Sequence, residues 1–90
     1  MANVDTSKTE AFVERLFGAA LGAIDTYAVY LGDRLGLYKA LAKDGPATPP
    51  ELAKRAGIHP RYAREWLEQQ AVSEVLEVDD PAKPEDRRRY

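Results

Sequence analysis

The sequence predicts a mostly α-helical winged helix-turn-helix domain, preceded by a long N-terminal helix and closed by a short β wing. Three observations support this fold class. Residues 46–78 carry start and stop signals for two short helices joined by a tight turn. A β-prone run follows these helices directly. Residues 8–35 repeat apolar side chains with the period of an α-helix.

The first helix of the helix-turn-helix begins at a capping box formed by Thr48 and Glu51. Pro49 occupies the first helical position, where its missing N–H removes no hydrogen bond and its fixed φ suits the helix. Gly57 supplies the left-handed residue at which this helix ends. Ile58 is expected to fold back as the apolar contact behind the helix end.

The second helix begins at or just before His59, has Pro60 at its first position and runs toward Val72. Its buried face is predicted to contain Ala63, Trp66, Leu67 and Gln70, with Trp66 as the core anchor. His59 is interpreted as a helix cap, because no neighbouring residue marks it as a catalytic base.

A short strand is predicted at residues 75–78, followed by the turn-rich segment 79–86. Its partner strand is expected in residues 87–90. Because a returning strand this short leaves backbone groups unpaired, we expect the chain to be the front piece of a longer protein, truncated in the wing.

The N-terminal part divides into a flexible arm, residues 1–7, and a long helix over residues 8–35 that a capping box of Ser7 and Glu10 opens. One line of this helix carries Phe12, Leu16, Ala19, Ala23, Tyr27 and Tyr30, and the adjoining lines carry Val13, Phe17, Ala20, Leu21, Ile24, Ala28, Leu31 and Leu35. Together they span an apolar arc of about 200°.

An arc this wide exceeds what a helix packed on one side requires. Two interpretations remain open: the helix is central to one compact domain, or one side docks on a second copy or on a missing domain. A membrane span is disfavoured, because Leu16–Leu31 contains only sixteen residues and includes Asp25. Gly32 and Gly36 are expected to mark a kink or break, after which residues 37–42 form a short helix.

Composition narrows the function. Ninety residues form one domain with a net charge of −2, from 13 basic and 15 acidic residues, which disfavours nucleic acid as a partner. The chain has no cysteine and a single histidine, so neither a disulfide nor a metal site is predicted. The N-terminus lacks the pattern of a signal peptide, and a cytoplasmic location is expected.

The motif residues resemble a known family. Residues 31–78 look like the N-terminal winged-helix and dimerisation region of class I S-adenosylmethionine-dependent methyltransferases, the bacterial small-molecule type related to plant O-methyltransferases. The matching positions are Leu35–Tyr38, Gly45, Pro46, Thr48, Glu51–Ala53, Gly57–Pro60, Arg61, Arg64 and Leu67. The resemblance covers residues 12–90. It departs at Glu74, where the family tends to have glycine. Either this position has a positive φ, which costs Glu about 1 kcal/mol or more, or the preceding helix runs on through it.

The resemblance implies that residues 8–35 form a dimerisation segment and residues 36–90 a winged-helix domain. The implied homodimer interface contains Phe12, Val13, Leu16, Phe17, Ala20, Leu21 and Ile24. Tyr27 and Tyr30, the aromatic residues with polar tips on the same face, are the candidates for contacting a substrate, with core or interface packing as the alternative.

No catalytic, cofactor-binding or metal-ligating residue is assigned within the chain. The resemblance implies that S-adenosylmethionine binds to a C-terminal catalytic domain outside this sequence, on a Gly-rich loop that follows a strand. The fragment alone is therefore expected to be inactive. The sequence specifies neither the methyl acceptor nor its acceptor atom.

A DNA-binding transcriptional regulator is the alternative function. The helix-turn-helix, Arg61 and Arg64 near the start of the second helix, and the basic run 87–89 favour it. Glu65 and Glu68 on the same helix and the net charge oppose it, because carboxylates repel phosphates.

Overall fold

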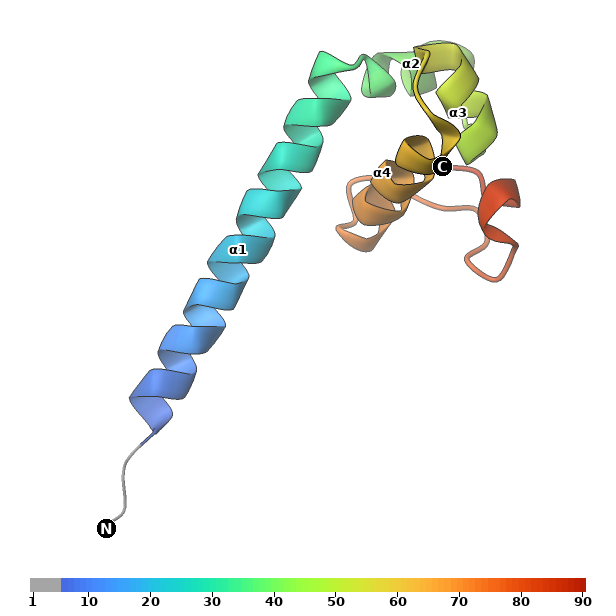
Figure 1. The fold of residues 1–90 in the computed structure, drawn as a ribbon. Coiled ribbons are helices and arrows are strands. Elements are labelled where there is room, and N and C mark those ends of the chain that lie inside the picture. Colours follow the sequence, from blue (N-terminus) through green and yellow to red (C-terminus); the bar gives the residue numbers. More distant parts are fainter. Residues whose placement is uncertain (1–5) are drawn as a thin grey trace.

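The computed structural model describes residues 6–90, which form helices and connecting loops. The elements are α1 (Ser7–Arg34), α2 (Leu37–Asp44), α3 (Pro49–Ala56), α4 (Pro60–Val72) and the single 3₁₀ turn η1 (Glu85–Arg87). Helices α2, α3 and α4 gather with η1 into a small body, and α1 leaves this body as a straight arm (Figure 1). Of the predicted flexible arm, residues 1–5 lie outside the described part, and Ser7 already belongs to α1.

The arm gives the molecule an elongated shape. Its principal extents are 62 × 29 × 19 Å and its radius of gyration is 17.7 Å. A compact chain of this length has a radius of gyration of about 12 Å. Figure 1 shows that the N-terminal half of α1 passes no other element. The predicted alternative of a helix central to one compact domain is therefore wrong for this half.

The start of α1 differs from the prediction. The cap is Thr6, whose carbonyl accepts from the Glu10 N–H (2.8 Å) and whose hydroxyl donates to the Glu10 carboxylate (3.2 Å). The predicted capping box of Ser7 and Glu10 is thus replaced by an interaction one residue earlier.

The capping residues that begin and end α3 are as predicted. Thr48 N–H donates to the Glu51 carboxylate (3.0 Å), and Glu51 N–H donates to the Thr48 hydroxyl (3.4 Å). The hydrogen bond from the Thr48 backbone is the main cause that lowers the pKa of Glu51. Gly57 ends α3 with φ of +70°, and the N–H of Ile58 returns to the Ala53 carbonyl (3.0 Å).

His59 caps α4, with its Nδ1 accepting from the Arg61 N–H (3.1 Å). This confirms its interpretation as a helix cap.

The core of the body is small and lies between α2, α3 and α4. Its fully buried side chains include Leu37, Leu52 and Leu67, which come from one helix each. Trp66 connects this core to α1, and its ring meets the Tyr38 ring edge-on with centroids 5.1 Å apart. The predicted core face of α4 is confirmed, because Ala63, Trp66, Leu67 and Gln70 are all buried.

The two glycines at the end of α1 have different roles. Gly36 breaks the chain direction with φ of +70° and precedes α2. Gly32 stays inside the helix, where a Cβ atom would lie 2.5 Å from both the Trp66 ring and the Tyr38 ring. Gly32 therefore permits the close approach of α1 to α4, and only Gly36 marks the predicted break.

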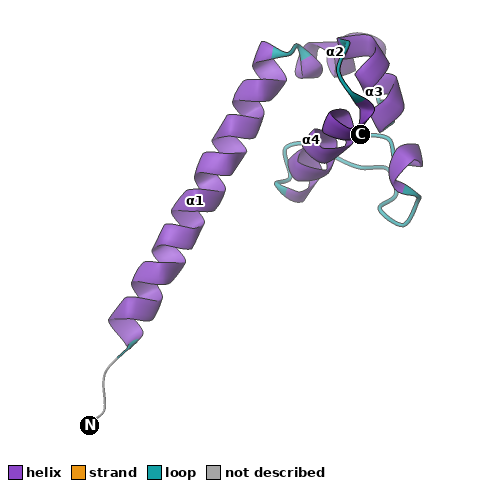
Figure 2. Ribbon diagram, viewed as in Figure 1, coloured by secondary structure: helices purple, strands orange, loops and turns teal. Residues whose placement is uncertain are grey.

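The predicted β wing is wrong in detail, because residues 6–90 contain no strand (Figure 2). The returning segment divides its hydrogen bonds between two partners. Arg89 accepts from the Asp79 N–H (3.0 Å), while Tyr90 exchanges two backbone hydrogen bonds with Ala47 (3.1 and 2.9 Å). The Arg89 N–H binds the Asp79 carboxylate (3.0 Å) in place of a backbone carbonyl, so a strand ladder does not extend.

Of the two possibilities at Glu74, the structure has the positive φ. Glu74 has φ of +60°, which makes it the one non-glycine residue with positive φ in the described chain. The helix ends just before it, and the N–H groups of Val75 and Leu76 both return to the Gln70 carbonyl (2.9 and 3.2 Å). The strain at Glu74 thus accompanies a tight helix end that directs the chain into the 75–84 loop.

The close packing at Gly32 yields a first prediction. Gly32→Ala is expected to lower the free energy of unfolding by about 1–3 kcal/mol, because the added methyl group overlaps the buried Trp66 ring and the partly buried Tyr38 ring. Gly22→Ala is the matched control in the same helix, since a Cβ atom there meets nothing within 4 Å, and it should stabilise by about 1 kcal/mol. Urea denaturation followed by Trp66 fluorescence measures both. Equal effects of the two substitutions would contradict the assigned role of Gly32.

The Asp79 carboxylate binds both the Arg89 N–H and the Lys83 ammonium group, and this set of contacts, the Asp79 clamp, yields a second prediction. The Lys83 ammonium group, 2.7 Å away, is the main cause that lowers the pKa of Asp79 to about 2, and the Arg89 N–H adds to it. The stabilisation by this carboxylate is therefore complete above its ordinary pKa of 3.8 and is lost as the pH falls toward 2.

Asp79→Asn is expected to reduce the loss of unfolding free energy between pH 4 and pH 2 in urea titrations. Asp86→Asn is the control, because this exposed carboxyl lies in the same segment but outside the clamp. An unchanged pH profile in the Asp79 variant would show that the clamp does not stabilise the fold.

Candidate functional site: the apolar face of α1 and its groove

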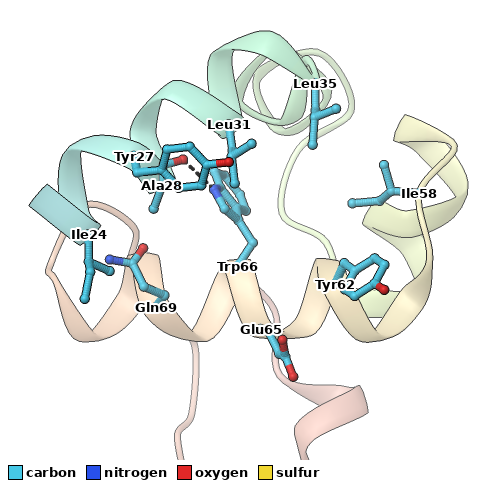
Figure 3. Close-up of a pocket in the computed structure, with 10 residues that line it drawn as sticks. All are labelled: Ile24, Tyr27, Ala28, Leu31, Leu35, Ile58, Tyr62, Glu65, Trp66 and Gln69. Carbon is cyan, nitrogen blue, oxygen red and sulfur yellow. Dashed lines mark hydrogen bonds between the residues drawn. The ribbon is translucent and has the colours of Figure 1, made fainter.

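The C-terminal third of α1 docks on α4 through a buried hydrogen bond. Trp66 Nε1 donates to the Ala28 carbonyl (2.8 Å), and Figure 3 shows the indole directed from α4 toward α1. Ala28 and Gly32 are the buried positions of α1. Both are small, which lets the indole lie against the helix backbone. One side of α1 is therefore fixed, over its last turns only.

A polar chain reinforces this contact. Asp25 Oδ1 accepts from Gln69 Nε2 (2.7 Å) and from the Ser73 hydroxyl (2.6 Å), which connects α1 to the end of α4. Gln69 in turn accepts from Gln70 (2.7 Å), whose own oxygen accepts from the Tyr38 hydroxyl. Burial raises the pKa of the Tyr38 hydroxyl, which is the donor in this bond. Asp25 thus connects α1 to α4 through side-chain hydrogen bonds.

A groove of about 440 Å³ opens beside this contact, between α1 and α4. Figure 3 shows Ile24, Tyr27 and Leu31 on α1 above Tyr62, Trp66 and Gln69 on α4. The remaining lining residues are Ala28, Leu35, Ile58 and Glu65. Figure 3 shows the Glu65 carboxylate pointing away from α1, so the surface facing the groove is apolar.

The seven predicted interface residues lie on the arm and are all exposed: Phe12, Val13, Leu16, Phe17, Ala20, Leu21 and Ile24. Phe12, Leu16 and Phe17 keep 55%, 54% and 66% of their surfaces accessible. A single chain rarely leaves so much contiguous apolar surface in water without a partner. The groove continues this apolar face, because Ile24 belongs to both.

Tyr27 and Tyr30 lie at the junction of arm and groove. Tyr27 lines the groove, and the Tyr30 ring stacks beside it with a centroid distance of 6.3 Å. Both side chains are exposed. The structure thus brings the two predicted substrate contacts together, with Tyr27 alone in the groove lining.

A comparison with protein families matches residues 23–85 to the Rv2258c-like winged HTH domain. The match spans the docked part of α1, all of α2, α3 and α4, and the first residue of η1. The chain belongs to this family. The match begins at Ala23, so the exposed N-terminal half of α1 lies outside the family's common region. No curated protein matches the chain.

In this winged HTH domain, two arginines of α4 and two of the C-terminal basic run bind acidic side chains or a backbone carbonyl. Arg61 pairs with Glu65 (3.3 Å), and Arg64 pairs with Glu85 of η1 (3.1 Å). Arg89 pairs with Glu51 (2.9 Å), and Arg88 donates to the Lys83 carbonyl (2.8 Å). A phosphate backbone would have to displace these partners, which weakens the case for this face as a DNA-binding surface.

The described residues contain neither a metal-binding cluster nor a membrane-spanning helix. Within residues 6–90, no group of three or more histidine or acidic residues is arranged to hold a metal ion. None of the helices within residues 6–90 is long and apolar enough to cross a membrane.

Sequence reasoning did not find the α4 wall of the groove. Trp66 was predicted as a core anchor, and Glu65 was named only as an acidic residue that opposes DNA binding. Tyr62 and Gln69 were not singled out. Tyr62, Trp66 and Gln69 are spaced by four and three residues, which places them on one helical face. The exposed aromatic Tyr62 on that face is the signal that points to a site in this winged HTH domain.

Proposed function

We propose that this chain is the dimerisation and substrate-lid module of an S-adenosylmethionine-dependent methyltransferase. The observation that carries the proposal is the exposed apolar face of α1, which runs without interruption into the groove on α4. The winged HTH body fixes one side of the helix and leaves the other to a partner. S-adenosylmethionine binds, in this proposal, to the catalytic domain of the parent protein.

The dimer has a direct energetic reason. Burying a large apolar side chain such as Phe12, Leu16 or Phe17 stabilises by about 1.5–3 kcal/mol. In a two-fold interface each of these side chains is buried twice, once in each copy, so its contribution to the free energy of association doubles. Pairing two such faces therefore supplies enough free energy to offset the cost of association.

The lid function rests on the position of Tyr27. Its ring borders an apolar groove of a size suited to a small molecule, and its hydroxyl provides a polar end. In the parent enzyme, α1 and α4 cover the methyl acceptor and keep water from it, while the transfer chemistry belongs to the catalytic domain.

Self-association is the first test. Leu16→Glu is expected to weaken the dimer roughly 100-fold or more, because it places two carboxylates in an apolar interface. Val29→Glu is the matched control, since Val29 is also exposed on α1 but lies on the opposite side of the helix. Sedimentation equilibrium over a wide concentration range measures the dissociation constants.

Two results would contradict the proposal. Equal effects of Leu16→Glu and Val29→Glu would remove the interface from the apolar face. A strictly monomeric chain with tight affinity for duplex DNA would favour the transcriptional regulator instead.

The lid is tested in the complete methyltransferase. Tyr27→Ala is expected to raise KM for the methyl acceptor about 10-fold, through loss of an aromatic contact, and to leave the Kd of S-adenosylmethionine unchanged. Steady-state kinetics and isothermal titration calorimetry separate these two constants. Val29→Ala serves as the control on the far side of α1. An unchanged KM in the Tyr27 variant would assign this ring to packing alone.

A further inference from the structure

We infer that two copies pair their α1 helices antiparallel about a two-fold axis that passes between Ala19 and Ala23. In this register Val13 and Phe17 of one copy enter the groove between α1 and α4 of the other. The inference deepens the proposed function and rests on it, because it specifies how the second copy binds and what fills the groove.

The first support is the order of side-chain sizes along the exposed line of α1. The order is Phe12, Leu16, Ala19, Ala23, Tyr27 and Tyr30, with every member exposed. Two large residues, two small ones and two large ones read the same in both directions. Two helices can therefore approach closely at the alanines while the large rings interdigitate at both ends. This pattern permits pairing but does not choose between parallel and antiparallel helices.

The two flanks of this line differ in polarity. At 100° per residue, the flank next to the groove carries Val13, Phe17, Ile24 and Leu31. The opposite flank carries Lys8, Arg15, Thr26 and Asp33, all of them exposed. At these eight positions, one flank is thus apolar and the other is charged or polar.

The flanks decide the direction of pairing. In an antiparallel pair related by a two-fold axis, each flank meets the same flank of the second copy, whereas in a parallel pair it meets the opposite flank. Antiparallel pairing places Phe17 against Ile24 and Lys8 near the oppositely charged Asp33. Parallel pairing would place Lys8 and Arg15 along Val13 and Phe17, which leaves charges facing apolar side chains. The antiparallel arrangement is therefore favoured.

The groove provides an independent reason. An antiparallel second copy lays its N-terminal half along the C-terminal half of α1, where the groove opens toward solvent. Its Val13 and Phe17 then face Ile24, Leu31 and Trp66. One symmetry operation covers both the unpacked arm of each copy and the open groove of the other. The groove is thus completed by the second copy, and Tyr27 lies at the junction of the two chains.

Spin-label distances test the direction of pairing. The chain has no cysteine, so Lys8→Cys provides a single site for a nitroxide on the polar flank of α1. The axis near residue 21 separates the two labels of an antiparallel dimer by about 39 Å along the helices, since each residue rises about 1.5 Å. Mixing this variant with labelled Asp33→Cys should add a short distance between chains. Pulsed electron paramagnetic resonance measures both.

The outcomes separate this inference from the proposed function. A short distance between Lys8 labels would establish a parallel dimer, which overturns the inference and retains dimerisation through α1. Monomers with no distance between chains would overturn both. The long distance, together with the short distance in the mixed sample, is the expected result.

Quenching of Trp66 fluorescence tests whether the second copy occupies the groove. Trp66 is the only tryptophan, and a nitroxide quenches tryptophan fluorescence only at short range. Within one chain, Val13 lies about 22 Å along α1 from Ala28, the residue that contacts Trp66. A nitroxide at Val13→Cys should therefore quench Trp66 in the dimer and not after dilution to monomers. A diamagnetic label of the same size is the control. A labelled dimer without quenching would overturn the insertion into the groove.

Discussion

The hydrogen bond from Trp66 to the Ala28 carbonyl is the contact on which the rest of the architecture depends. A buried indole needs a partner for its N–H group, and here that partner is the backbone of a helix that begins far from α4 in sequence. Gly32 leaves room for the ring one turn further along. The position of one side chain thus sets where α1 meets the body and in which direction the arm leaves it.

The extent of that contact explains the exposed surface. The body is built from short helices, α2 and α3 with eight residues each and α4 with thirteen, and it covers only the last turns of a helix of 28 residues. The apolar pattern nevertheless continues to Phe12. Packing within one chain does not explain these exposed apolar residues. An exposed apolar face of this kind is typical of a surface that binds a partner. The body accounts for the packing of the last turns of α1, and the proposed pairing with a second copy would account for the exposed remainder.

Local signals in the sequence predicted the local structure well, because capping and turn formation involve neighbouring residues. Thr48, Gly57 and His59 each take the role that their positions indicate. The long-range contacts were harder. Trp66 was recognised as an anchor, but its acceptor on α1 depends on where two helices cross. The hydrogen bonds of Asp25 were not predicted, because neither Gln69 nor Ser73 lies near it in sequence.

The wing failed as a prediction for a related reason. A β-prone run becomes a strand only if a partner offers a regular series of donors and acceptors. The backbone of Arg89 instead bonds to Asp79 and that of Tyr90 to Ala47, and a carboxylate takes the place of one carbonyl. The groove was missed in the same way. Its α1 wall was visible in the periodicity, whereas its α4 wall required the crossing of α1 and α4 to be known.

The balance of charges indicates what this winged helix is suited to bind. A DNA-binding face needs cations that are free to exchange their counterions for phosphates. Arg61, Arg64 and Arg89 instead each have a carboxylate within 3.3 Å. Surface ion pairs of this kind contribute little to stability, so their main consequence is electrostatic, and they neutralise the face. On α1, by contrast, the Phe12 and Phe17 rings stay more than half exposed in the described part of the chain. The free energy available for recognition therefore lies on the apolar arm and its groove, which favours association with a second protein surface over nucleic acid.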